Sequence, residues 1–287
     1  MAKSLIRYDL TLPGYFTYPP APSVATRPMI PRREPRGLYM RGEYGTKPDG
    51  KLRPIVAHNT THLDVPYHFL EDGDDLAHVL NRPQWPADRP CLARVALLGG
   101  RSEMPEAYTR DGVTYCETIS GDVLPAEEIL RDYEALVILT GFGAIMTASP
   151  ASPFVVEGDG NYHVPHLTDS AVERILASGL RLIALDSTGV EPQIGTDPVR
   201  FSSEVHFRLL GHSPPVHIVE GLDGASLVRR LGYLPEEGLL HVVARRVNEA
   251  GADAAHSRVF LYLYRDDADG TALRNLADTL RAEEMYG

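Results

Sequence analysis

The chain has 287 residues, enough to bury a sizeable core in one large domain or two ordinary ones. Its content of 43% hydrophobic and 23% charged residues is typical of a globular protein and excludes disorder along the whole chain. The formal net charge is -11 and no basic stripe is present, so we expect no nucleic-acid partner.

The N-terminal region opens with an alternating segment at residues 6–12, which predicts a strand. Prolines and glycines then interrupt residues 13–52 so densely that neither a long helix nor a central strand fits there. The same stretch is too aromatic for a simple linker. We interpret it as a loop insert that either lines a substrate pocket or crosses the surface.

The rest of the chain interleaves strands and helices. We predict strands at 55–64, 91–98, 135–140, 180–185, 216–219, 239–247 and 258–264, and helices at 168–179, 202–210, 225–231 and 273–284. Thr168 or Ser170 can cap the first of these helices, and Gly179 can end it. Because a buried strand follows directly, this helix and strand form the unit that parallel sheets use. No repeat and no composition break divides the chain, so we predict a single α/β domain.

The cysteine content and the first residues of the chain indicate the expected cellular location. Cys91 and Cys116 are too few for a disulfide framework or a thiolate zinc site. The first residues hold no apolar signal-peptide core, and no run reaches the roughly 18 apolar residues of a membrane span. We therefore expect a cytoplasmic protein with no membrane partner.

The candidate metal-ligating and catalytic side chains are concentrated in the segment 58–68. On an extended strand alternate side chains share a face, so His58, His62 and Asp64 should project together. Two imidazoles and one carboxylate suit a divalent metal such as zinc or manganese. The alternative is a set of unrelated histidines on a polar strand. Pro66 interrupts the strand before His68, which suits a catalytic histidine beside the metal better than a further ligand.

Three protein ligands leave a zinc ion with a free position for water or substrate, as a catalytic site requires. A metal lowers the pKa of its bound water to about 7, and a histidine can pass protons at that pH. The segment therefore predicts a metal-dependent enzyme.

With this segment the chain resembles the cyclase-like metal hydrolases, the family of bacterial kynurenine formamidase and isatin hydrolase. The family signature HxGTHxDxPxH matches residues 58–68 at every fixed position except the glycine, which is Thr60 in this chain. Five further segments also resemble segments of this family: residues 9–11, 139–141, 182–187, 206–211 and 218–222.

The resemblance implies mixed sheets that form a barrel-like core flanked by helices, the swivelling β/β/α arrangement. It implies one or two Zn2+ or Mn2+ ions per chain and a homodimer or homotetramer. It also implies that a first metal is held by His58, His62 and Asp64. His206 would ligate a second ion, which Asp64 and Glu220 would share with the first. Otherwise His206 is an ordinary half-buried helix residue and Glu220 a solvated strand end.

The activity implied by the resemblance is hydrolysis of an amide-like C–N bond in a small molecule, of the aryl formamide or lactam class. Metal-activated water would attack, and His68 would serve as general acid and base. The early-loop tryptophan of the formamidase pattern has no equivalent, since the sole tryptophan is Trp85. Tyr15, Phe16 and Tyr18 are the candidates to stack on a substrate ring instead.

Two alternatives remain for the same residues. A cyclase or lyase would use the metal as a Lewis acid without net hydrolysis, and a non-catalytic protein would only bind the metal. Retention of His68 favours catalysis over the last.

Overall fold

A computed structural model describes residues 5–12, 44–46, 52–54, 58, 61–70, 72–82, 89–99, 107–148, 161, 163–196, 199–231, 235–244, 252–264 and 271–286. The predicted insert at 13–52 lies outside the described residues except for 44–46 and 52. The candidate substrate residues Tyr15, Phe16 and Tyr18 therefore also lie outside them.

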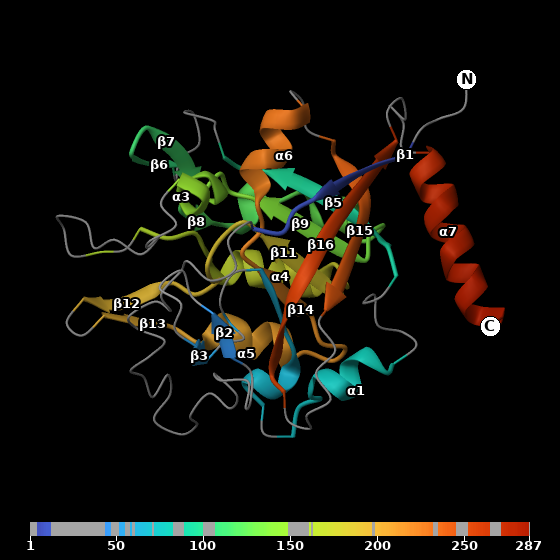
Figure 1. Ribbon diagram of the computed structural model, residues 1–287, viewed down its shortest axis with the longest axis horizontal. Helices are drawn as coiled ribbons and strands as arrows, with labels where there is room; N and C mark the ends of the chain where they lie inside the picture. Colours follow the sequence, from blue (N-terminus) through green and yellow to red (C-terminus); the bar gives the residue numbers. More distant parts are fainter. Residues whose placement is uncertain are drawn as a thin grey trace.

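The core is a mixed sheet whose strands close into a barrel (Figure 1). In hydrogen-bonding order the barrel strands are β16 (Ala254–Tyr264), β15 (Glu237–Ala244), β5 (Cys91–Leu97), β9 (Ala135–Leu139), β11 (Leu182–Leu185), β14 (His217–Glu220) and β4 (His62–Asp64). The pairing of β4 with residues 254–256 of β16 closes the ring, and β1 (Leu5–Asp9) pairs with residues 260–264 of β16. The predicted barrel-like core is confirmed.

Both strand directions contribute to the barrel. Strands β5, β9, β11 and β14 run parallel to one another, whereas β4, β15 and β16 pair antiparallel with their neighbours. Parallel strands need crossover connections, and α4 (Asp169–Ala177) belongs to one of them. Its start is capped by Thr168, whose side chain accepts from the backbone N–H of Ala171, and Gly179 follows it at φ 75°.

Helices flank the barrel in the part of the chain that the structure describes (Figure 1). Besides α4 they are α1 (Leu76–Leu80), α2 (Glu127–Leu130), α3 (Gly143–Ala148), α5 (Glu204–Leu210), α6 (Gly224–Leu231), α7 (Thr271–Tyr286), and the 3-10 turns η1 (Pro66–His68) and η2 (Gly121–Val123). Helix α7 packs along β5, β15 and β16.

Small two-stranded sheets complete the described structure. They pair β2 (Tyr44–Thr46) with β3 (Leu52–Pro54), β6 (Ala107–Arg110) with β7 (Val113–Cys116), β8 (Thr118–Ile119) with β10 (His166–Leu167), and β12 (Gln193–Thr196) with β13 (Val199–Phe201).

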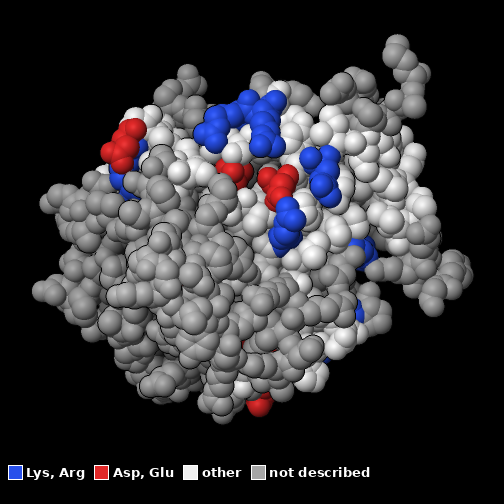
Figure 2. Space-filling model, in the orientation of Figure 1, with Lys and Arg blue, Asp and Glu red and all other residues white. Residues whose placement is uncertain are grey.

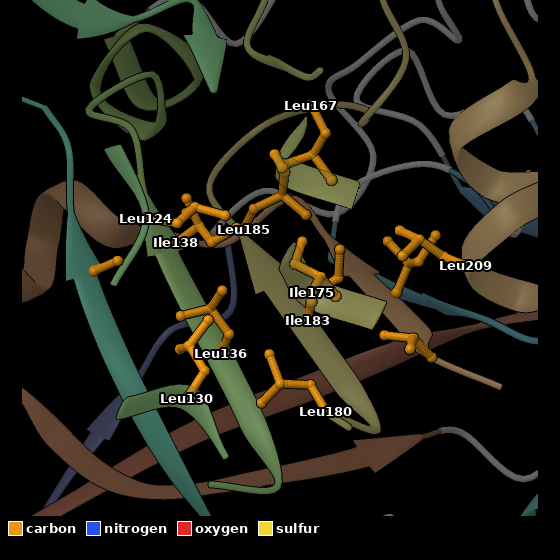
Figure 3. Close-up of a cluster of buried hydrophobic side chains, with 14 of the residues drawn as sticks. Leu124, Leu130, Leu136, Ile138, Leu167, Ile175, Leu180, Ile183, Leu185 and Leu209 are labelled. Carbon is orange, nitrogen blue, oxygen red and sulfur yellow. The ribbon is translucent and has the colours of Figure 1, made fainter. Parts of the chain in front are cut away.

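Alternation along the barrel strands builds two apolar layers. In β9, Leu136 and Ile138 point out of the barrel and pack with Ile175 of α4, as Figure 3 shows. The alternate residues Ala135 and Val137 join the barrel interior. Because both faces of β9 are covered, all five of its residues are buried, which explains its uninterrupted apolar sequence.

One predicted strand is wrong in extent. Among the described residues of the predicted strand 55–64, His62–Asp64 form β4, whereas His58 lies in a turn ahead of it. Pro66 opens the 3-10 turn η1, so the extended segment around the motif is short. The remaining predicted strands and helices are confirmed within a few residues at their ends.

Basic and acidic side chains lie side by side on the described surface near α6 and the β1–β16 edge (Figure 2). Arg258 pairs with Asp9 there. Among the described helices, none combines the length and apolar character that crossing a bilayer needs.

Candidate metal centre

The centre is built on the outer face of the barrel, where β4 and β14 pair antiparallel. Glu220 lies opposite His62 in this register, and Leu63 lies opposite Val219. Leu63 and Val219 belong to the interior layer, so alternation turns His62, Asp64 and Glu220 outward. Their ligand atoms lie within 4.8 Å of one another.

His62 faces both carboxylates. Its Nε2 atom lies 3.5 Å from Oδ1 of Asp64 and 3.5 Å from Oε2 of Glu220. All three side chains are buried, and Asp64 is completely inaccessible to solvent. The strand pairing thus brings together the two acids that the resemblance places between metal ions.

His206 reaches the same acids from α5. Its Nε2 lies 3.6 Å from Oδ2 of Asp64 and 3.4 Å from Oε1 of Glu220. Its Nδ1 lies 2.9 Å from Oε1 of Glu191, which also accepts the backbone N–H of His206 at 2.8 Å. Burial lowers the pKa of His206, but contacts with Asp64, Glu191 and Glu220 outweigh this and raise it well above its usual value.

His58 approaches Asp64 from the turn before β4. Its Nδ1 lies 2.9 Å from Oδ1 of Asp64, and its Nε2 lies 3.3 Å from Oδ2 of Asp253. Burial opposes the charged ring, but Asp253 and Asp64 outweigh it and raise the pKa of His58 to about 10. His58 therefore lies in the cluster beside Asp64, but a turn and not strand alternation places it there.

His68 stands beside the cluster at the end of η1. Its ring stacks on His58 with centroids 4.0 Å apart, and its Nδ1 lies 3.0 Å from Oδ2 of Asp253. Burial and the neighbouring His58 lower the pKa of His68 despite the contact with Asp253. A ligand atom of His68 also lies within 4.8 Å of those of His58 and Asp64.

The donor set fits a divalent cation. Within the described part of the chain, both oxygens of Asp64 and Oε1 of Glu220 are buried and face imidazole nitrogens at 2.9–3.6 Å, without a hydrogen bond of favourable geometry. Two buried carboxylates side by side are costly unless cationic charge compensates them, and a cation held by these oxygens and the facing imidazoles would supply that charge. Nitrogen and oxygen donors without thiolates are those that zinc and manganese accept at catalytic sites.

Asp186 has a structural role near the ends of β9 and β11. It is completely buried and accepts hydrogen bonds from the backbone and hydroxyl of Thr140 and from the backbones of Gly141 and Gly143. These bonds hold the turn after β9 against the end of β11. Asp186, which directly follows β11, thus anchors a turn.

Sequence reasoning missed two acids, Glu191 and Asp253. Both are buried. Asp253 contacts Nε2 of His58, whose Nδ1 faces Asp64, and Glu191 contacts Nδ1 of His206, whose Nε2 faces Asp64 and Glu220. Neither belongs to a motif, and Asp253 lies far along the chain from His58 and His68. The tertiary contacts are the signal that identifies them.

Solved structures of other proteins share this fold. One described as a potential metal-dependent hydrolase with cyclase activity is 18% identical, with a TM-score of 0.51, over 90% of this chain and 98% of its own. An isatin hydrolase bound to the product analogue thioisatinate is 13% identical, with a TM-score of 0.54, over 91% of this chain and 93% of its own. Isatin hydrolase A from Ralstonia solanacearum is 14% identical, with a TM-score of 0.54, over 90% of this chain and 92% of its own.

A comparison with curated protein sequences finds no match. The Cyclase family model matches residues 8–192, which include the whole 58–68 segment, the parallel strands β5, β9 and β11, and Glu191. This match covers more than half of the chain, and the barrel agrees with it. The chain belongs to the Cyclase family.

Proposed function

We propose that this protein is a metal-dependent hydrolase that cleaves an amide-like C–N bond of the aryl formamide or lactam class. The observation that carries the proposal is the convergence of the buried carboxylates of Asp64 and Glu220 with the rings of His58, His62 and His206. The fold shared with isatin hydrolases supports the lactam class, since isatin is a cyclic aryl amide.

Each of the two acids, Asp64 and Glu220, faces different imidazoles with its two carboxylate oxygens. Oδ1 of Asp64 faces His58 and His62, whereas its Oδ2 faces His206. Glu220 divides its oxygens in the same way between His62 and His206. This division supports binding of one or two divalent cations by these five side chains. A bound cation polarises a carbonyl and lowers the pKa of water to about 7.

His68 is the proton carrier in this proposal. Its Nδ1 is held by Asp253, which leaves Nε2 to accept and return a proton. Burial lowers the pKa of this ring, which favours the neutral form in which Nε2 starts as a base. After accepting a proton, the same nitrogen can protonate the departing nitrogen of the cleaved amide.

A substrate panel tests the proposal. The purified protein, loaded with zinc or with manganese, is offered aryl formamides, isatin-like lactams and aryl lactones in water enriched in 18O. We expect metal-dependent cleavage of a formamide or lactam with one 18O atom in the acid product. Turnover without 18O would favour the cyclase or lyase alternative. Metal binding without any turnover would favour the non-catalytic one.

A matched pair of variants makes this test specific to the site. Asp64→Asn removes the acid at its centre and should abolish both metal binding and turnover. Asp75→Asn changes another buried aspartate, one that caps α1 and pairs with the exposed His78. This control should retain both, because asparagine also caps helices.

A further inference from the structure

We propose that Asp253 is a positioning residue that fixes the ring orientation and tautomer of two imidazoles at once, the candidate ligand His58 and the candidate proton carrier His68. The inference rests on the proposed function for the roles of these two histidines. The contact geometry of Asp253 is independent of those roles.

The fold holds Asp253 firmly beside the motif. Asp253 immediately precedes β16, and the β4–β16 register pairs the next residue, Ala254, with Asp64. The backbone carbonyl of Asp253 accepts the N–H of Val65 at 3.2 Å, and that of Ala252 accepts the N–H of Leu76 at 2.9 Å. The strand pairing that closes the barrel thus sets this carboxylate next to the motif.

A single oxygen of Asp253 meets both rings. Oδ2 lies 3.3 Å from Nε2 of His58 and 3.0 Å from Nδ1 of His68. An ionised carboxylate only accepts hydrogen bonds, so both nitrogens must carry hydrogen in these contacts. Asp253 is 1% exposed, so little solvent competes for this oxygen.

The tautomers that follow are those the proposed chemistry needs. A neutral His58 with hydrogen on Nε2 has its lone pair on Nδ1, the atom 2.9 Å from Oδ1 of Asp64. A neutral His68 with hydrogen on Nδ1 has its lone pair on Nε2, where proton transfer is proposed. The carboxylate of Asp253 therefore directs the lone pair of His58 toward the proposed metal site beside Asp64. It leaves the lone pair of His68 available to the substrate.

Glu191 shows the same arrangement with one ring only. It accepts from Nδ1 of His206 and leaves Nε2 of that ring toward Asp64 and Glu220. Carboxylates that orient metal-binding histidines in this way are recurrent, and their loss typically costs about 10–100-fold in metal affinity or activity. Asp253 differs because its second ring is the proton carrier. Its loss should therefore reduce turnover beyond the effect of metal loss.

Nitrogen NMR on histidine-labelled protein measures the tautomers directly. Long-range 1H–15N correlations of the zinc-loaded protein distinguish hydrogen on Nδ1 from hydrogen on Nε2, and His58→Gln and His68→Gln assign the two rings. We expect hydrogen on Nε2 in His58 and on Nδ1 in His68. Either ring in the opposite tautomer overturns the proposal, and this result requires no variant of Asp253.

Asp253→Asn then measures the consequence. We expect zinc affinity, by competition with a chelator, to fall about 10–100-fold. At saturating zinc we expect a lower kcat with little change in KM, and a second tautomer of His68 in the spectrum. Asp75→Asn should change none of these. An unchanged spectrum, affinity and kcat in folded Asp253→Asn would also overturn the proposal.

The two proposals fail in different ways. If the protein shows the expected tautomers and binds zinc but cleaves no amide on the panel, the hydrolase assignment is lost and the positioning role of Asp253 stands. If amide cleavage is observed with the opposite tautomers, only the role of Asp253 is rejected.

Discussion

Glu220 lies directly opposite His62 in the antiparallel register of β14 and β4, with Oε2 of the acid 3.5 Å from Nε2 of the ring. Because side chains alternate along strands, a shift of one residue in this pairing would turn one of the two toward the barrel interior. The geometry of the centre therefore depends on the pairing that builds the barrel wall.

Replacing His68 by alanine tests its assignment as proton carrier. We expect kcat on the best substrate of the panel to fall by about 10²–10⁴-fold, because general acid–base catalysis typically contributes that much. Metal content, measured by elemental analysis, should stay near that of the unmodified protein. His78→Ala is the control, since this exposed ring lies outside the cluster. Loss of metal from His68→Ala would instead make His68 a ligand.

Replacing Glu191 by glutamine tests its hold on His206. The glutamine keeps one carbonyl acceptor but loses the charge and the second acceptor oxygen. We expect zinc affinity to fall by about 10–100-fold in isothermal titration, with the fold retained. Glu237→Gln is a suitable control because that acid pairs with Tyr133 and Arg274 instead. Equal affinities in the two variants would argue against this role.

Zinc affinity should increase with pH across the neutral range. Burial disfavours protonation of His58, but Asp253 and Asp64 raise its pKa to about 10 in the metal-free protein. Below that pH the ring is doubly protonated, so a metal must displace the proton on Nδ1. Each displaced proton makes the apparent affinity rise about tenfold per pH unit. Titrations in buffers of different ionisation enthalpy count the released protons, and a count of zero would contradict this prediction.

His217 should make the fold sensitive to acid. Burial and the nearby Arg181 lower its pKa from 6.5 to about 3, so the folded protein holds a neutral ring. This contribution to stability is complete above the unfolded pKa near 6.5 and is lost as pH falls toward 3. In His217→Asn the free energy of unfolding should therefore decline less steeply between about pH 6.5 and 4, by a few kcal/mol. Parallel denaturant titrations at each pH measure this difference, and identical slopes would refute it.

Local sequence patterns predicted a large part of the fold. Residues 168–179 contain the cap, the apolar face and the terminating glycine that predict helix α4, and the buried strand β11 follows it. Closure of the barrel was not predictable from such patterns, because it depends on pairing between β4 and β16, which are distant in sequence. The barrel entered the sequence analysis only through the family resemblance.

The candidate site shows the same limit. His62 and Asp64 share a face because they alternate on β4, as predicted. His58 reaches Asp64 from a turn, so its position beside Asp64 does not come from alternation along a strand. Asp253 and Glu191 contribute through hydrogen bonds to imidazoles, and nothing in their local sequence specifies those partners.

Anomalous diffraction from crystals soaked with zinc or manganese tests the central claim most directly. We expect a peak in the metal-edge difference map within about 2.0–2.3 Å of ligand atoms of His62, Asp64 and at least one further predicted ligand. A map without a peak among these side chains at saturating metal, or a peak held by other residues, would contradict it.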